Sequence, residues 1–252
     1  MPGSFTDEGI VLRRVNYGEA DRVLTVLTRG HGKVGVMARG VRKAGSRLAA
    51  RTDLFERSRM QLAEGRGELL VLAQAQGSER PAPRRDDDPR RAACAAVVAE
   101  LTDRVLEEHH PDAEIFDLVG RALDQARDPH SDPRCALVRF ARQMIDRLGY
   151  RPQLHTCANC ARQLPELPAA FSAALGGLLC ADCRSADPAA LDCPVRTIKV
   201  LRVAAEGGDD TWGRLRLDPE ALAVQEAIIE RELEQHLDRR LRSWEVLRAL
   251  GG

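Results

Sequence analysis

The sequence predicts an α+β protein of several domains: a small N-terminal β-barrel, then a helical domain that carries an inserted cysteine-rich ribbon. Three observations support this prediction. Apolar and polar residues alternate over residues 8–76, apolar stripes at helical spacing follow residue 88, and two pairs of closely spaced cysteines lie within residues 157–183. A length of 252 residues permits one large domain or two to three smaller ones.

Five short segments in the N-terminal part have the alternation of half-buried strands, and glycine-containing turns separate them. These segments are residues 10–13, 23–27, 34–38, 54–62 and 69–75. Five such strands predict a small barrel. Because a short helix is also expected at residues 46–51, after the third strand, the pattern matches the oligonucleotide/oligosaccharide-binding (OB) fold. We assign this domain to residues 1–80.

Helices are expected after a linker at residues 77–90, which is rich in proline, aspartate and arginine. Aspartate followed by proline is typical of a helix start, and this pair occurs at residues 88–89, 132–133 and 218–219. The last of these pairs precedes a helix that the apolar spacing extends from Pro219 to Leu250. We assign the helical domain to residues 81–154 and 186–252.

The two cysteine pairs predict a metal site. Cys157 and Cys160, and then Cys180 and Cys183, are each two residues apart, and nineteen residues separate the pairs. This spacing is that of a zinc ribbon, which we place at residues 155–185 as an insertion. Four protein ligands leave no position for a substrate, so we expect one structural zinc ion. Cys193 and His155 lie close enough in sequence to replace one of the four ligands.

The charge is unevenly distributed along the chain. Residues 1–80 hold fourteen Lys or Arg and nine Asp or Glu, a net charge of +5, so the remainder carries −5. Such asymmetry favours a nucleic-acid-binding face. The alternative is a charged face that is only solvated. The candidate DNA contacts are Lys33, Arg39, Arg42, Lys43, Arg47, Arg51, Arg57 and Arg59. Few aromatic residues accompany them, so phosphate neutralisation should supply most of the binding energy.

No catalytic motif is complete, and we expect the protein not to be an enzyme. Glycines 30, 32 and 35 match the GxGxxG pattern, but a strand is expected after them where that motif requires a helix. Gly32-Lys33 lacks the Ser or Thr of a phosphate-binding loop. The acids and histidines at residues 107–112 are interpreted as a solvated helix end. The absence of a signal peptide or membrane-length apolar segment predicts a cytoplasmic protein with no membrane partner. Binding to DNA would make this cytoplasmic protein nucleoid-associated.

Several motifs together resemble the RecO family of bacterial DNA repair proteins. They are Glu8 to Leu12, Tyr17-Gly18-Glu19-Ala20-Asp21, Leu24 to Thr28, Gly32-Lys33, Ala38 to Arg42 and Ser46 to Leu48. The two cysteine pairs, with Gly176 and Gly177 before the second, resemble the zinc motif of this family, and His236-Leu237 with Leu241-Arg242-Ser243 resembles its final helix. Ala20 stands where the family has serine. The resemblance is dense over residues 8–76 and thin over residues 80–150.

The resemblance implies a recombination mediator of the RecF pathway. Such a protein binds single- and double-stranded DNA and anneals complementary strands without ATP. With a RecR partner it helps RecA replace single-strand-binding protein (SSB), and it contacts the C-terminal tail of SSB. A protein-binding adaptor, in which the helical domain is the functional surface and the charge of the barrel is incidental, is the alternative. A nuclease is the third possibility.

Overall fold

The computed structural model describes residues 3–65, 67–77, 88–206, 217–237 and 240–250. They form two compact units, the first made of residues 1–137 and 241–252 and the second of residues 138–240. The helices predicted for a single helical domain are therefore divided between the two units. Most of the expected linker, residues 78–87, lies outside the described residues. Within the described part of the chain, no helix is long and apolar enough to span a membrane.

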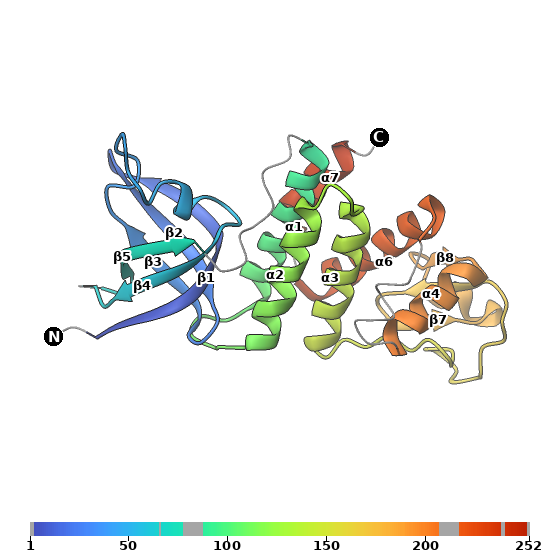
Figure 1. Ribbon diagram of the computed structural model, residues 1–252. Coiled ribbons are helices and arrows are strands. Elements are labelled where there is room, and N and C mark those ends of the chain that lie inside the picture. Colours follow the sequence, from blue (N-terminus) through green and yellow to red (C-terminus); the bar gives the residue numbers. More distant parts are fainter. Residues whose placement is uncertain (1–2, 66, 78–87, 207–216, 238–239, 251–252) are drawn as a thin grey trace. The chain divides into compact units, whose positions relative to one another are not determined.

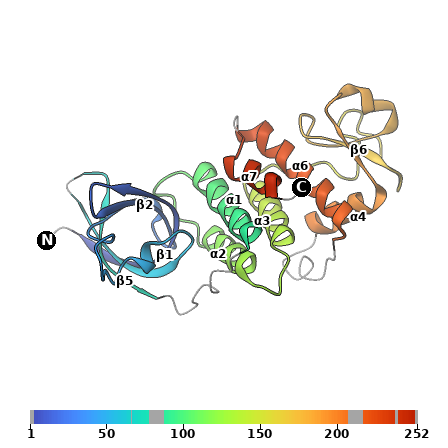
Figure 2. The same ribbon diagram turned by 90° about the horizontal axis from the view of Figure 1, so that it is seen from above.

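The first unit begins with a closed five-stranded barrel in the order β1-β2-β3-β5-β4 (Figure 1), and Figure 2 looks into its ring. The strands are β1 (Ser4–Tyr17), β2 (Asp21–Thr28), β3 (Gly32–Ala38), β4 (Arg57–Ala63) and β5 (Leu70–Gly77). The ring closes because the long β1 pairs with β4 through its first half and with β2 through its second half. The predicted OB fold is confirmed.

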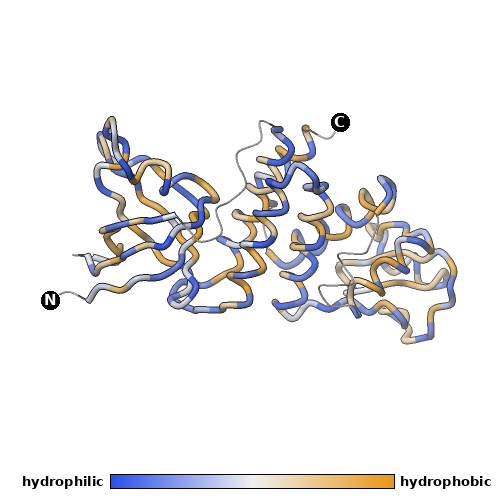
Figure 3. Tube along the Cα trace, viewed as in Figure 1, coloured by the Kyte–Doolittle hydropathy of each residue, from blue (hydrophilic) through white to orange (hydrophobic). Residues whose placement is uncertain are grey.

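The apolar side chains whose alternation predicted the strands also fill the interior of the barrel. Inward residues from all five strands form one buried cluster, and stretches of hydrophobic residues are seen along the barrel strands in Figure 3. The cluster consists of Val11, Leu24, Val26, Val34, Val36, Ala38, Val41, Met60, Leu62 and Leu72. Val41 comes from the loop after β3, and it ties that loop to the interior of the barrel.

Three helices complete the first unit: α1 (Pro89–Val105), α2 (Ala113–Arg127) and α7 (Arg242–Leu250). The predicted helix start at Asp88 is confirmed, because its carboxylate accepts a hydrogen bond from the Arg90 backbone N–H (2.9 Å). Asp112 caps α2 in the same way. The acidic and histidine-rich stretch at residues 107–112 therefore follows the end of α1 and leads into α2.

The second unit contains helices and a small sheet. α3 (Pro133–Arg147) runs into it from the first unit, and α4 (Val195–Glu206) and α6 (Pro219–Leu237) follow. The three-stranded sheet β7-β6-β8 consists of β6 (Ala169–Ser172), β7 (Gly177–Leu179) and β8 (Leu191–Cys193), and a 3₁₀ turn, η2 (Ala181–Ala186), follows β7. β8, which pairs with β6, lies after residue 185, where we assigned the end of the insertion.

A buried ion pair joins α3 to α6 within the second unit. Arg142 donates a hydrogen bond to the Glu232 carboxylate (2.6 Å), and it also contacts Asp146 (3.2 Å) and the Tyr150 carbonyl oxygen (3.1 Å). Burial raises the pKa of Glu232, and the neighbouring Arg142 guanidinium opposes that rise. A cation and an acid this deeply buried are tolerated because each satisfies the other.

Two predicted elements were wrong. The helix expected at residues 46–51 is a series of turns that ends in a short 3₁₀ turn, η1 (Ala50–Thr52). The helix expected from Pro219 to Leu250 is two helices, since α6 ends at Leu237 and α7 begins at Arg242. The break between α6 and α7 has a structural cause, because the Glu100 carboxylate of α1 caps the start of α7. It accepts hydrogen bonds from the backbone N–H groups of Arg242 (3.2 Å) and Ser243 (2.8 Å) and from the Ser243 hydroxyl (2.6 Å).

Replacing Glu100 by alanine should therefore destabilise the first unit by about 1–2 kcal/mol, the usual cost of a lost helix cap. Burial of the Glu100 carboxyl opposes its ionisation, but the hydrogen bonds from Ser243 and Arg242 outweigh burial and lower its pKa. Its contribution is thus present above the ordinary glutamate pKa and is lost as pH falls through the lower folded-state pKa. Urea denaturation at pH 7 and pH 3 measures both effects.

Glu107→Ala is the matched control, because that carboxylate is largely exposed and its one described ionic contact is to His110 at 3.8 Å. Equal stabilities of the Glu100→Ala and Glu107→Ala proteins at pH 7 would show that the cap does not hold α7.

Candidate nucleic-acid interface and metal centre

The basic loop, residues 39–51, is held against the hairpin between β1 and β2. The Gly40 N–H donates to the Asp21 carboxylate (2.7 Å), and the Arg42 N–H donates to the Ala20 carbonyl oxygen (2.9 Å). The Arg42 guanidinium donates to the Gly18 carbonyl oxygen (3.1 Å). Gly40 and Gly45 have φ of +65° and +78°, a left-handed conformation that glycine adopts without strain. The loop thus presents its cations from a defined backbone.

Most of the predicted DNA contacts are exposed. Arg39, Arg42, Lys43 and Arg47 on the basic loop and Arg59 on β4 have exposed side chains, and no carboxylate of the described residues is within ion-pair distance of them. Arg51 is half-buried, and its guanidinium lies close to Gly77 at the end of β5. The exposed cations are available to an external anion.

Two arginines that the sequence reasoning did not include add positive charge at this end of the barrel. Arg14 and Arg22 share the Asp53 carboxylate, and Arg22 also donates to Thr52 Oγ1 (3.3 Å). Burial lowers the pKa of Arg22, and the positive charges of Arg14 and Arg42 lower it further. The effect of Arg42 on Arg22 indicates that positive charge is concentrated here. The sequence signal for these two arginines is their position near the turn between the first two strands. Asn16 pairs with Arg22, and Arg14 lies two residues before Asn16 on the same strand.

The other two predicted contacts, Lys33 and Arg57, lie in different surroundings from those expected. Lys33 is only 8% exposed, and its ammonium group contacts the Asp103 carbonyl oxygen (2.5 Å) and carboxylate (3.2 Å) on α1. The Arg57 side chain is 11% exposed and contacts Asp124 on α2 (3.3 Å). It lies across Gly120, where an added Cβ would be 2.0 Å from the guanidinium. We therefore leave both residues out of the interface.

The four paired cysteines converge on one point in the second unit. Their sulfur atoms all lie within 4.8 Å of one another, and the Cys160 and Cys180 sulfurs are 3.8 Å apart. A tetrahedral zinc ion with Zn–S bonds of about 2.3 Å would separate its sulfurs by about 3.8 Å. The four thiols could therefore hold a metal ion, and their number and spacing are compatible with zinc.

The local backbone explains how each pair turns toward the same point. The Ala161 N–H donates to the Cys157 carbonyl oxygen (2.9 Å), and the Cys183 N–H donates to that of Cys180 (3.0 Å), so each pair closes a tight turn. The sulfurs also accept hydrogen bonds: Cys157 from the Cys180 N–H and Cys183 from the Asn159 side chain, both at 3.4 Å. Burial opposes thiolate formation at Cys157, but the backbone N–H donors outweigh it and lower its pKa to about 6.

The two alternative ligands lie outside this cluster. His155 is exposed and its ring contacts Glu206 (2.6 Å). Cys193 is buried in the apolar cluster of the second unit, where burial raises the pKa of its thiol to about 12. Among the described residues, the metal-ligating group consists of Cys157, Cys160, Cys180 and Cys183 alone.

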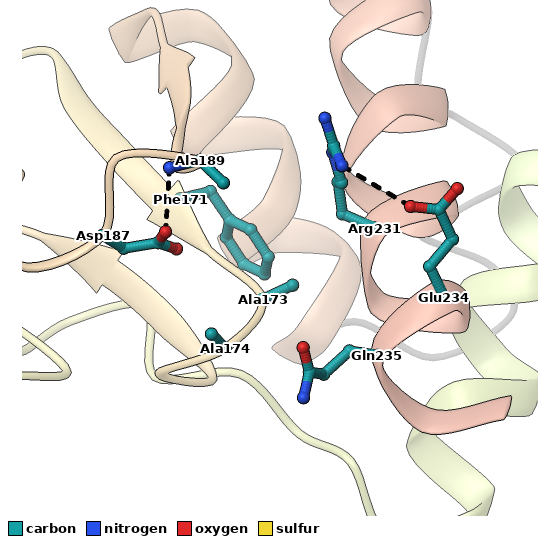
Figure 4. A pocket seen from close by; sticks show the side chains of 8 residues that line it. All are labelled: Phe171, Ala173, Ala174, Asp187, Ala189, Arg231, Glu234 and Gln235. Atoms are coloured by element: carbon teal, nitrogen blue, oxygen red, sulfur yellow. Dashed lines mark hydrogen bonds and ion pairs between the residues drawn. The ribbon is translucent and has the colours of Figure 1, made fainter. Parts of the chain in front are cut away.

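A pocket of about 190 Å³ lies between the β6 region and α6 (Figure 4). Phe171 and Ala173 supply an apolar side, and Arg231, Glu234 and Gln235 of α6 supply a polar side. Asp187 faces the pocket, and its carboxylate already accepts hydrogen bonds from Ser172 (2.6 Å) and the Ala189 N–H (2.9 Å). The pocket has the volume of one or two side chains, and its described lining residues include no nucleophile placed beside a base.

Comparison with known proteins gives consistent matches over both units. A family profile described as "Recombination protein O N terminal" matches residues 1–80, and one described as "Recombination protein O C terminal" matches residues 86–245. A protein of Roseiflexus sp. (strain RS-1), named DNA repair protein RecO, is 36% identical over 239 residues, which cover 95% of this chain and 83% of the relative.

Two further proteins with the same name match over nearly their full lengths. The one from Desulforudis audaxviator (strain MP104C) is 36% identical over 249 residues, 98% of this chain and 97% of the relative. The one from Anaeromyxobacter sp. (strain K) is 33% identical over 243 residues, 96% of this chain and 95% of the relative.

The surroundings of Lys33 generate a prediction about stability. Lys33→Ala should lower the free energy of unfolding by about 1–3 kcal/mol, because the carbonyl oxygen and one carboxylate oxygen of Asp103 lose the Lys33 ammonium group. Lys43→Ala, which removes an exposed lysine from the basic loop, should change it by less than about 0.5 kcal/mol. Urea denaturation monitored by circular dichroism compares the two, and equal stabilities would contradict a structural role for Lys33.

Proposed function

Because the chain belongs to the RecO family and its role lies in DNA repair, we propose that its OB barrel binds DNA through the basic loop and anneals complementary strands without ATP. The observation that carries this proposal is the exposed group of loop cations, Arg39, Arg42, Lys43 and Arg47, which have no described carboxylate partner. Cations on an OB barrel are the usual track for the backbone of a single strand.

Annealing follows from charge neutralisation. Two complementary strands repel each other through their phosphates, and a protein that neutralises both backbones lowers this repulsion and raises their local concentration. Base pairing then supplies the driving force, so no nucleotide hydrolysis is needed. The protein contributes no catalytic step in this mechanism and is not an enzyme.

The proposed partners follow from the family. They are single- and double-stranded DNA, a RecR protein, and SSB through its C-terminal tail. In this proposal the chain, together with RecR, helps RecA to load on single strands coated with SSB.

We assign one zinc ion to the four cysteines, and its role is structural. All four ligand positions are filled by protein sulfurs, so no position is open to water or substrate. The ion would hold the two turns at residues 157–160 and 180–183 together, where the apolar cluster around Cys157 and Leu179 is small.

A protein-binding adaptor is the second candidate, and the pocket beside α6 favours it. Phe171 and the two alanines next to it could receive an apolar side chain, and Arg231 could pair with a neighbouring carboxylate of a peptide. DNA binding distinguishes the two functions. If the protein is only an adaptor, the charge of the barrel is incidental, and the protein should bind no DNA even though its second unit is intact.

The double variant Arg39→Glu/Arg42→Glu should bind a single-stranded oligonucleotide at least tenfold more weakly, and it should anneal complementary oligonucleotides more slowly. Wild-type affinity should fall with salt with a slope on the order of −3.5 for about five neutralised phosphates, and the variant should flatten this slope by about 1.4. Fluorescence anisotropy between 50 and 300 mM salt measures both, and annealing should be equally fast with and without ATP.

Lys199→Glu/Arg240→Glu is the matched control, since it makes the same change in net charge at exposed positions of the second unit. Equal losses of affinity in both double variants would indicate a net-charge effect and would remove the basic loop from the proposal. Unchanged affinity in Arg39→Glu/Arg42→Glu would remove it as well.

Elemental analysis of the purified protein should give about one zinc per chain. Cys157→Ser should lose the metal and unfold the ribbon at lower temperature, whereas Cys193→Ser should keep the metal because Cys193 lies outside the sulfur cluster. DNA binding by the barrel should persist in both. A fully folded protein without metal would leave the four cysteines without the assigned role.

A further inference from the structure

The outer face of the barrel has a row of apolar side chains beside the basic loop. Strand pairing places Val15 opposite Val23, Val23 opposite Met37, and Met37 opposite Val71, so the row crosses β1, β2, β3 and β5. On β2, β3 and β5 these residues alternate with the inward residues and therefore point outward. On β1 the register shifts between Val11 and Arg13, and Val15 then pairs with the outward Val23. Val15 is 51% exposed, and the other three are partly exposed.

Tyr17 continues this face at the end of β1. It lies two residues after Val15, on the same side of the strand, and it is 58% exposed. The next residue is Gly18, whose carbonyl oxygen accepts the hydrogen bond from the Arg42 guanidinium. A large exposed ring thus lies at the hairpin that holds the basic loop.

The other two aromatic residues of the barrel are already engaged. Phe5 stacks on His31 with ring centroids 3.7 Å apart, and the Arg127 guanidinium lies over the Phe55 ring at 5.8 Å. Within the described residues of the barrel, Tyr17 is therefore the aromatic ring without a ring or cation contact.

We propose that this face, Tyr17 together with the row Val15, Val23, Met37 and Val71, receives the bases of a single strand whose phosphates the basic loop holds. This inference rests on the proposed function and deepens it, because it specifies a preference for single strands. Loop cations and a neighbouring apolar face match the two surfaces of an unpaired strand, its anionic backbone and its flat bases. The bases of a duplex are stacked on one another and cannot use this face.

The test compares two labelled oligonucleotides of equal length, one of thymidines and one of abasic sites, which has the same phosphates and no bases. Wild-type protein should bind the thymidine strand about fivefold or more tightly than the abasic strand, the effect of one stacked base. Tyr17→Ala should lose most of this ratio and keep its affinity for the abasic strand. Tyr17→Phe should preserve the ratio, since it retains the ring.

Tyr150→Phe is a control in the second unit, where the ring of Tyr150 stacks on His236, and it should change neither affinity. If Tyr17→Ala binds both strands as the wild type does, or weakens both equally, the inference is overturned while DNA binding by the loop stands. If the wild-type protein binds neither strand at low salt, the proposed function fails and the inference fails with it.

Discussion

The ion pairs between the barrel and its two neighbouring helices decide which charges of this protein face outward. Lys33 contacts Asp103, Arg57 contacts Asp124, and Arg29 forms a two-pronged pair with Asp117 at 2.5 and 2.8 Å. The hydrogen bond with Arg29 lowers the pKa of Asp117 and so keeps that acid ionised. Lys33 and Arg57 lie in poorly solvated positions and need such partners, because their desolvation is otherwise unopposed, whereas Arg29 and Asp117 form an exposed pair. These pairs fix the barrel against α1 and α2 and leave the cations of the basic loop to external anions.

Local patterns in the sequence predicted most of the fold. Alternation identified the five strands, since each strand has one face in a small core, and aspartate before proline located the starts of α1, α3 and α6. The two Cys-x-x-Cys pairs predicted a sulfur cluster, because a two-residue spacing lets a single turn direct both sulfurs to one point. Each of these signals lies within a few residues of the feature that it predicts.

The errors came from contacts between residues far apart in the chain. The break between α6 and α7 depends on Glu100, more than 140 residues before the N–H groups that it caps. Lys33 and Arg57 appeared to be surface cations because an outward position on a strand is usually solvated. Their positions are instead covered by α1 and α2, which begin more than thirty residues later in the chain. A count of basic residues cannot reveal which of them are neutralised within the fold.

The same ion pairs also bear on the net negative charge of residues 81–252. Residues 81–252 carry a net charge of −5, which alone argues against a polyanionic ligand. Yet Asp103, Asp117 and Asp124 belong to that remainder, and they neutralise basic residues of the barrel. Their negative charges are therefore neutralised by cations of the first unit and do not repel a phosphate that approaches the basic loop. Since an ion responds to the local potential more than to the total charge, a formally neutral protein can have a cationic binding surface.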